Sequence, residues 1–204
     1  MEIGSFRGRS TIVLASAAPP SAEVIAIDPH AGNDRGPQEI DGYVDEAEED
    51  NEIFNANLEA AGVRDRVRHV RAFSNEAHGD VKGGIDLLYI DGAHRYAPAL
   101  EDIRTWGARV VPGGVLLIHD AFSSVGVTGA IARECFWSDE WRYEGRSRSM
   151  VEYHRERVGR TANLGHQVAQ LPWFARNVLI KVLIVAKLGR FTRYLGHREP
   201  TWPY

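Results

Sequence analysis

Short hydrophobic runs alternate with longer segments of helical periodicity along most of this chain. The hydrophobic runs predict five β-strands, near 1–4, 23–28, 67–72, 85–90 and 114–119. The segments between them predict helices, at about 9–18, 44–61, 75–81 and 97–110. Strands that alternate with helices are typical of βαβ units, so the pattern predicts an α/β fold with a doubly wound, mainly parallel, Rossmann-like sheet.

The pattern changes beyond the fifth strand. Residues 127–137 predict a further helix, and residues 141–144 and 149–154 predict a β-hairpin that turns over 145–148. Such a hairpin would add antiparallel strands at the edge of the sheet. We expect Trp106, Trp137 and Trp141 to pack in the core or at the sheet edge, not to form a cage for a substrate.

Charge divides the chain into two regions. Residues 1–159 carry 17 Lys/Arg and 27 Asp/Glu, which gives a net charge of −10. Residues 160–204 carry 7 Lys/Arg and 1 Asp/Glu, which gives a net charge of +6. We therefore assign residues 1–159 to one compact domain and residues 160–204 to a basic helical extension. Cys135 is the single cysteine of the sequence, which excludes an internal disulfide and favours a cytoplasmic location.

The extension leaves two interpretations open. A helix-compatible run begins at Pro172, its apolar residues are spread around the helix, and basic residues follow as far as Arg198. Residues 172–198 either lie peripherally at the inner membrane surface, which suits a glycolipid acceptor, or pack on the domain or across a homodimer. We find no stretch of about 20 apolar residues that could cross a bilayer. Nucleic acid is not an expected partner, because the acidic region would repel phosphate.

The turn after the first strand predicts a nucleoside site. Glu2, Gly4 and Gly8 form an E-x-G-x-x-x-G pattern, and Asp28 ends the second strand. The glycines let backbone approach a ligand closely, and a carboxylate at the end of the second strand suits two ribose hydroxyls. Glu2 stands where a dinucleotide fingerprint has glycine; its charge would repel pyrophosphate but tolerate a sulfonium and an ammonium group. The pattern favours S-adenosylmethionine, although an ordinary strand–turn–helix remains the alternative.

Polar residues also end the fourth and fifth predicted strands. Asp91 follows the fourth strand, with His94 in the next turn, and His119 and Asp120 follow the fifth. In a doubly wound sheet these ends share the edge that carries the Glu2 turn, so we expect the four side chains to converge there. The alternatives are structural: Asp91 caps a helix, and each histidine satisfies a buried partner. The loop at 29–42 is either a lid over this edge or a surface excursion.

These segments resemble a known family. The D-G-x-H-x-Y segment at 91–96 and the P-G-G-x-x-x-x-H-D segment at 112–120, together with the Glu2 turn, are similar to class I S-adenosylmethionine-dependent methyltransferases. The subfamily they resemble contains small-molecule and sugar O-methyltransferases and cephalosporin-hydroxylase-like proteins, and the resemblance covers about residues 1–155. It implies an enzyme that methylates a hydroxyl of a small molecule, sugar or glycolipid. The cofactor contacts that it implies are Gly4, Ser5 and Gly8 on the methionine part, Asp28 on the ribose, Phe73 and Ser74 on the adenine, and Asp91 near the sulfonium. Glu2 of the same turn is also expected among the cofactor-binding residues.

A hydroxyl acceptor needs a base or a metal ion. His94 and His119 are the candidate bases, because imidazole takes up a proton near neutral pH. In metal-assisted relatives, strand-end carboxylates hold a divalent cation, and the matching positions here are Asp91, His119 and Asp120. The imidazole suits Mn²⁺ better than Mg²⁺.

Rival functions are an NAD-type oxidoreductase and a non-catalytic docking protein. Because Met1 directly precedes the first strand, we expect the natural chain to begin further upstream.

Overall fold

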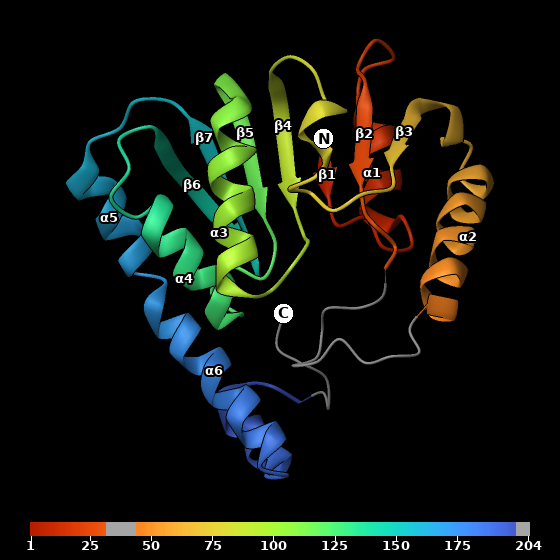
Figure 1. Ribbon diagram of the computed structural model, residues 1–204. Helices are drawn as coiled ribbons and strands as arrows, with labels where there is room; N and C mark the ends of the chain where they lie inside the picture. Colours follow the sequence, from red (N-terminus) through yellow and green to blue (C-terminus); the bar gives the residue numbers. More distant parts are fainter. Residues whose placement is uncertain (32–43, 199–204) are drawn as a thin grey trace.

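A seven-stranded sheet forms the centre of the molecule (Figure 1), and its strand order is β3-β2-β1-β4-β5-β7-β6. This computed structural model describes residues 1–31 and 44–198, with residues 44–47 described by their backbone alone. The predicted lid at 29–42 therefore falls outside the described residues from residue 32 onward. The strands are β1 (Glu2–Ile3), β2 (Val24–Ile27), β3 (Val67–Val70), β4 (Ile85–Ile90), β5 (Val110–Ile118), β6 (Trp141–Ser147) and β7 (Met150–Arg155).

The strand directions confirm the predicted sheet. Strands β1 to β5 pair in parallel, and β7 runs antiparallel between β5 and β6. The hairpin turn is tighter than predicted. β6 continues to Ser147, and Arg148 takes up a left-handed conformation with a φ of 53°, so the chain reverses at 148–149.

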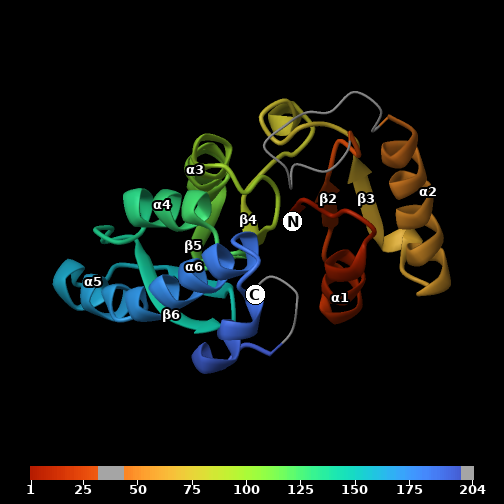
Figure 2. The ribbon, with the colours of Figure 1, turned by 90° about the horizontal axis from the view of Figure 1, so that it is seen from below.

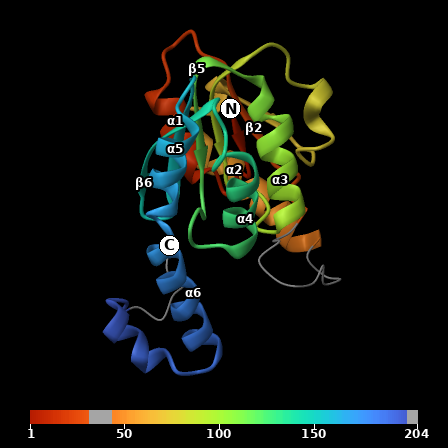
Figure 3. The same ribbon diagram turned by 90° about the vertical axis from the view of Figure 1, so that its left-hand side faces the viewer.

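Helices cover both faces of the sheet. They are α1 (Arg9–Ala17), α2 (Val44–Ala60), α3 (Tyr96–Thr105), α4 (Val125–Glu134), α5 (Arg160–Val168) and α6 (Leu171–Val185), with short 3-10 helices η1 (Arg64–Arg66), η2 (Ala77–Gly79), η3 (Gly107–Arg109) and η4 (Gly189–Leu195). Figures 2 and 3 show α3 and α4 on one face, and α1 and α5 on the other. A large hydrophobic core includes side chains of β4, β5, α3 and α4, and a smaller one joins α1, α2 and β2.

Two sequence predictions of secondary structure were wrong in extent. Residues 75–81 were expected to form a helix, but they contain only the single turn η2, which buries Ala77. So short a segment gains few helical hydrogen bonds for the cost of nucleation, and tertiary packing decides its shape. The fifth strand starts at Val110 instead of 114, and its pairing with β4 shifts register between Ile85 and Leu87. Gly113, with a φ of 82°, accommodates this irregularity inside the strand.

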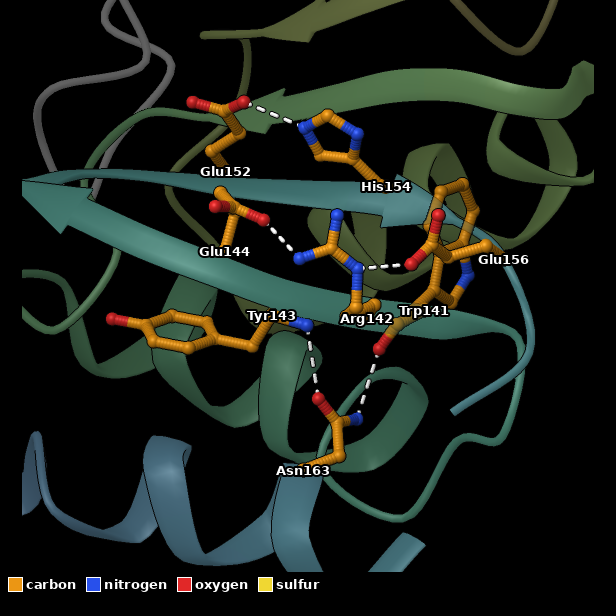
Figure 4. A network of polar contacts seen from close by, with 8 residues as sticks. All are labelled: Trp141, Arg142, Tyr143, Glu144, Glu152, His154, Glu156 and Asn163. Carbon is orange, nitrogen blue, oxygen red and sulfur yellow. Dashed lines mark hydrogen bonds and ion pairs between the residues drawn. The ribbon is translucent and has the colours of Figure 1, made fainter. Parts of the chain in front are cut away.

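The first helix of the basic extension is part of the domain core. In Figure 4, the Asn163 side chain of α5 reaches β6: its Oδ1 accepts from the Tyr143 backbone N–H, and its Nδ2 donates to the Trp141 carbonyl, both at 2.9 Å. Gln167 Oε1 accepts from the Tyr153 hydroxyl at 2.7 Å. Asn163 and Gln167 are buried. The change in charge at residue 159 is therefore not a border in packing.

The helices α5 and α6 follow each other almost without a break along one side of the molecule (Figure 1). The helical run Arg160–Val185 has a mean hydropathy of 1.4 in its most apolar window, of which 11% is buried. By length and composition alone, it is long and apolar enough to cross a membrane. The sequence expectation that no such stretch exists was therefore wrong.

Candidate functional site

Sheet register gathers the predicted site residues into one row. Ile3 is aligned with Ile27 of β2 and with Ile90 of β4, and Ile90 is aligned with Ile118 of β5. The residues that follow these positions therefore stand side by side at the carboxyl edge of the sheet, in the order Asp28, Gly4, Asp91 and His119. The predicted convergence of the strand ends is thus present.

The turn after β1 requires glycine at its first position. Gly4 has a φ of 85°, and a Cβ at this position would lie 2.3 Å from the Asp91 carbonyl oxygen. Gly8, with a φ of 82°, precedes α1, and a Cβ there would meet the Phe54 ring of α2 at 3.1 Å. Ser5 is buried, and its Oγ has no hydrogen-bond partner among the described residues. A buried hydroxyl without a partner is a group that a ligand can satisfy.

Strained backbone clusters at this edge of the sheet. Among the described residues, six non-glycine residues have a positive φ, and four of them lie in the loops after β1, β2 and β5: Phe6, His30, Asp120 and Phe122. Such conformations cost about 1–3 kcal/mol each and are enriched at functional sites. Phe6 and Phe122 were missed by the sequence analysis, since no residue pattern distinguishes an aromatic residue that adopts a positive φ.

Asp28 is held in place by backbone donors. Its Oδ2 accepts from the Phe6 N–H at 2.7 Å, and its Oδ1 accepts from the His30 N–H at 2.8 Å. Each carboxylate oxygen has a second lone pair, so the group can still accept two hydroxyls. His30 is buried, and its Nε2 lies 2.8 Å from the Phe6 carbonyl oxygen, so this histidine locks the two loops together.

Glu2 lies two residues before Gly4 on β1 and bonds to helix α1. It is fully buried, and its two carboxyl oxygens accept hydrogen bonds from the Ser10 and Thr11 hydroxyls of α1. Burial raises the pKa of Glu2 to about 7, because its effect is larger than that of the two hydroxyl hydrogen bonds, which lower the pKa. The structure thus shows Glu2 fastening α1 to β1, and its predicted contact with a cofactor remains a prediction.

The pKa of Glu2 predicts a pH-dependent stability. A folded-state pKa above the unfolded value means that the contribution of Glu2 is fully present below about pH 4.5 and is lost as the pH rises through about 7. We expect Glu2→Gln, which stays neutral, to gain stability relative to the wild type between pH 5 and pH 8.5, by up to ~3 kcal/mol. Urea unfolding at both pH values measures this change. Parallel pH profiles for the two proteins would contradict it, and the exposed Glu59→Gln serves as the control.

The loop after β3 carries the predicted adenine contacts. Phe73 is 52% exposed, so a face of its ring is available for stacking. Ser74 is anchored, because its carbonyl oxygen accepts from Trp106 Nε1 at 3.1 Å and its side chain bonds to the buried Asp102. Burial raises the pKa of Asp102 to about 6, although the hydrogen bond from Ser74 lowers the pKa in part. Asp102 was not predicted from sequence, since acidic residues within a helical pattern, such as the pair Glu101 and Asp102, usually face solvent.

The ends of β4 and β5 carry two histidine–carboxylate pairs. His94 Nε2 contacts Asp120 Oδ2, and His119 Nδ1 lies 3.1 Å from Asp91 Oδ1 and 3.6 Å from Asp120 Oδ1. Tyr89 donates its hydroxyl to Asp91 Oδ2 at 3.0 Å. The four predicted side chains therefore form one chain of contacts. Because Asp120 is almost fully buried, it orients imidazole groups that are themselves partly exposed.

The charge of Asp120 is stabilised by its neighbours. Burial on its own would raise the pKa of this carboxyl group, but the hydrogen bond from His94, with the charges of His94, His119 and Lys181, outweighs burial and lowers the pKa. Asp120 is thus an anion at neutral pH. Lys181 belongs to α6, and another residue of that helix, Asn177, donates to the Phe122 carbonyl at 3.0 Å. The extension therefore takes part in the site, which its composition did not reveal.

The backbone of His94 is clamped from the side. Ser124 caps α4 and donates its hydroxyl to the His94 carbonyl at 3.1 Å. At Gly126, a Cβ would lie 2.3 Å from the same carbonyl oxygen, so only glycine lets the first turn of α4 approach so closely. A small cavity lies beside this contact, and Asp91, His94 and His119 are among its lining residues.

The donor set does not fit the predicted cation. In the described part of the chain, no group of three or more His, Cys, Asp or Glu side chains is arranged to hold a metal ion. Each imidazole is instead paired with a carboxylate: His94 Nε2 contacts Asp120 Oδ2, and His119 Nδ1 lies 3.1 Å from Asp91 Oδ1. The metal ligands predicted at Asp91, His119 and Asp120 remain a prediction, and no chemical step below depends on them.

Comparisons with known proteins agree with this geometry. A family model described as a methyltransferase domain matches residues 1–121. The fold is similar to the O-methyltransferase NovP, with a TM-score of 0.58 and 18% identity over 76% of this chain and 71% of that one. It is also similar to the cofactor-bound Rv0187 from MTB, with a TM-score of 0.57 and 18% identity over 77% of this chain and 72% of that one. A third similar structure is an O-methyltransferase from Bacillus cereus in complex with SAH, with a TM-score of 0.50 and 18% identity over 75% of this chain and 72% of that one. At such low identity the structural likeness shows the fold alone.

Proposed function

The chain belongs to the methyltransferase-domain family whose model spans residues 1–121, and on that premise we propose that it is an O-methyltransferase acting on a hydroxyl of a small molecule, a sugar or a glycolipid. The observation that supports the proposal is the row of strand ends. This row places a glycine turn and a ribose-type carboxylate, Asp28, beside the two histidine–carboxylate pairs. The similarity to NovP and to the Bacillus cereus O-methyltransferase points to the same acceptor atom.

The described residues fit S-adenosylmethionine, the cofactor of this family. The Gly4 turn brings backbone to the ligand side, and the buried Ser5 hydroxyl still needs a partner. Asp28 is oriented to accept two ribose hydroxyls, and Phe73 exposes a ring for the adenine. Bound S-adenosylmethionine supplies a methyl group on an electrophilic sulfonium. The NAD-type alternative is not favoured by any of these contacts.

We assign the base to His94. Its Nε2 is the donor to Asp120, so Nδ1 is the ring's acceptor, because a neutral imidazole has one donor and one acceptor nitrogen. The acceptor hydroxyl would give its proton to Nδ1, and the Asp120 anion would stabilise the imidazolium that forms. His119 sits between Asp91 and Asp120 and holds both carboxylates in place. It remains the second candidate base.

Calorimetry with S-adenosylhomocysteine tests the cofactor site. We expect Asp28→Ala to weaken binding by at least roughly 10- to 100-fold, because each hydrogen bond from a ribose hydroxyl to the charged carboxylate contributes about 1.5–3 kcal/mol net. The exposed Asp80→Ala should bind like the wild type. If the folded wild-type protein did not bind S-adenosylhomocysteine, the cofactor assignment would fail. The acceptor is then identified by incubation with methyl-labelled cofactor and a cell extract, followed by mass spectrometry of the labelled product. Label on nitrogen or carbon would exclude O-methylation.

A further inference from the structure

The outward face of α6 exposes an apolar ridge that continues into the segment after it. The exposed side chains are Leu171, Leu179, Val182 and Val185 on the helix, and Leu188, Phe191 and Tyr194 beyond it. The opposite face of the helix is inserted into the domain through the buried Asn177 and Ile180. The apolar residues that seemed scattered in the sequence therefore serve two surfaces, one against the domain and one that faces outward.

Basic side chains accompany this ridge. Residues 160–198 contain seven Lys/Arg and no Asp or Glu. At the end of the ridge, the Arg190 guanidinium lies 4.8 Å from the Phe191 ring centre, and that of Arg193 lies 4.9 Å from the Tyr194 ring centre. Aromatic rings beside basic groups are typical of segments at a membrane–water interface. Four of the seven are exposed beyond the end of α6, namely Lys187, Arg190, Arg193 and Arg198. A cluster of about four Lys/Arg is enough to attract anionic lipid.

Internal contacts prevent this helix from crossing a bilayer while the domain stays folded. α5 bonds to the sheet through the buried Asn163 and Gln167, and the Asn177 amide of α6 bonds to the loop after β5. At the start of α6, the Trp173 ring lies between the guanidinium groups of Arg146 and Arg176, 4.4 and 4.6 Å away. These contacts hold α5 and the first part of α6 against the domain, so the outward ridge is positioned to lie on a surface and not to cross it.

Charge argues against a second copy of this chain as the occupant. In a two-fold symmetric contact through the ridge, the basic groups of one copy would face the same groups of the other, and no acidic residue in 160–198 would offset them. An anionic lipid surface instead complements both the charge and the apolar residues.

We propose that α6 and η4 dock the domain on an anionic lipid surface, with the apolar ridge at the boundary between head groups and acyl chains. Figure 3 shows this segment projecting beyond the carboxyl edge of the sheet. Asn177 binds the loop that follows Asp120, so the docked domain would hold the histidine–carboxylate pairs close to the lipid. This orientation suits an acceptor hydroxyl presented at the interface, and that last step alone rests on the proposed function.

Vesicle flotation tests the docking. We expect binding of the full chain to vesicles of phosphatidylcholine with ~30% phosphatidylglycerol to exceed binding to pure phosphatidylcholine by about tenfold or more. Arg190→Gln with Arg193→Gln should reduce binding by about 30-fold, since each basic group near such a surface contributes ~1 kcal/mol. Leu179→Glu with Val182→Glu should also abolish flotation. All four substituted side chains are on or beyond α6 and face solvent, so folding should be preserved.

Matched controls keep the outcome decisive. Arg9→Gln with Arg133→Gln removes two exposed arginines elsewhere, and Val13→Glu changes an exposed apolar residue on α1; both should float like the wild type. Failure of the wild type to float, or equal flotation with neutral vesicles, would overturn the proposal. A dimer in light scattering that Leu179→Glu with Val182→Glu dissociates would assign the ridge to a second copy instead. Binding of S-adenosylhomocysteine without vesicles is independent of all these results and reports on the proposed function.

Discussion

Replacing His94 by alanine is expected to lower the rate of methyl transfer by about 100- to 10,000-fold, the usual contribution of a positioned general base. The His94 ring contacts the buried Asp120 carboxylate through Nε2, whereas His119 Nδ1 lies further from that carboxylate, at 3.6 Å. The affinity for S-adenosylhomocysteine should stay within about threefold of the wild-type value, because the imidazole acts on the acceptor side. Single-turnover rates and calorimetry on the same preparation separate these two effects.

Two further variants make the His94 result specific. Asp120→Asn should lower the rate in the same direction, because an amide no longer stabilises the imidazolium. The exposed His166→Ala on α5 should change neither quantity. If His94→Ala kept the wild-type rate and His119→Ala lost it, the role of base would pass to His119. If both variants kept the wild-type rate, histidine catalysis at this site would be contradicted.

The largest expected effect on folding comes from Gly4→Ala. The added Cβ would have to occupy a left-handed conformation, which costs about 1–2 kcal/mol, and it would lie 2.3 Å from the Asp91 carbonyl oxygen, where backbone cannot move aside. We expect a loss of at least ~3 kcal/mol in the free energy of unfolding and loss of cofactor binding, since the turn and the end of β4 would separate. Urea unfolding monitored by tryptophan fluorescence measures the first quantity.

Gly79→Ala is the matched control for this substitution. A Cβ at Gly79 would meet no atom within 4 Å, and its φ is not positive. Its stability should therefore change by less than ~1 kcal/mol. If Gly4→Ala were as stable as this control, the close approach of the first turn to the end of β4 would not exist in solution.

The carboxyl edge of the sheet could be predicted because its causes are local. Each strand is a short hydrophobic run, each run ends in a polar residue, and parallel register places those ends together. Asp28, Asp91 and His119 followed from that logic alone. The same logic does not say where a side chain points, which is why the buried carboxylate of Glu2, bonded to Ser10 and Thr11, was not anticipated.

The features that sequence reasoning missed depend on contacts between distant segments. The close approach of Gly126 to His94, the buried Asp102 beside Ser74 and the bond from Asn177 to the Phe122 carbonyl each join parts of the chain at least 28 residues apart. No pattern of neighbouring residues encodes such contacts. The helix expected at 75–81 failed for the same reason, because η2 is shaped by the core it covers.

The amides of α5 join the basic C-terminal region of this chain to the acidic domain that precedes it. Asn163 and Gln167 complete the hydrogen bonds of Tyr143, Trp141 and Tyr153, so a protein cut at the charge boundary would leave polar groups of its last two strands unsatisfied in an apolar interior. The region that looks like an accessory tail therefore completes hydrogen bonds on which the folded edge of the sheet depends.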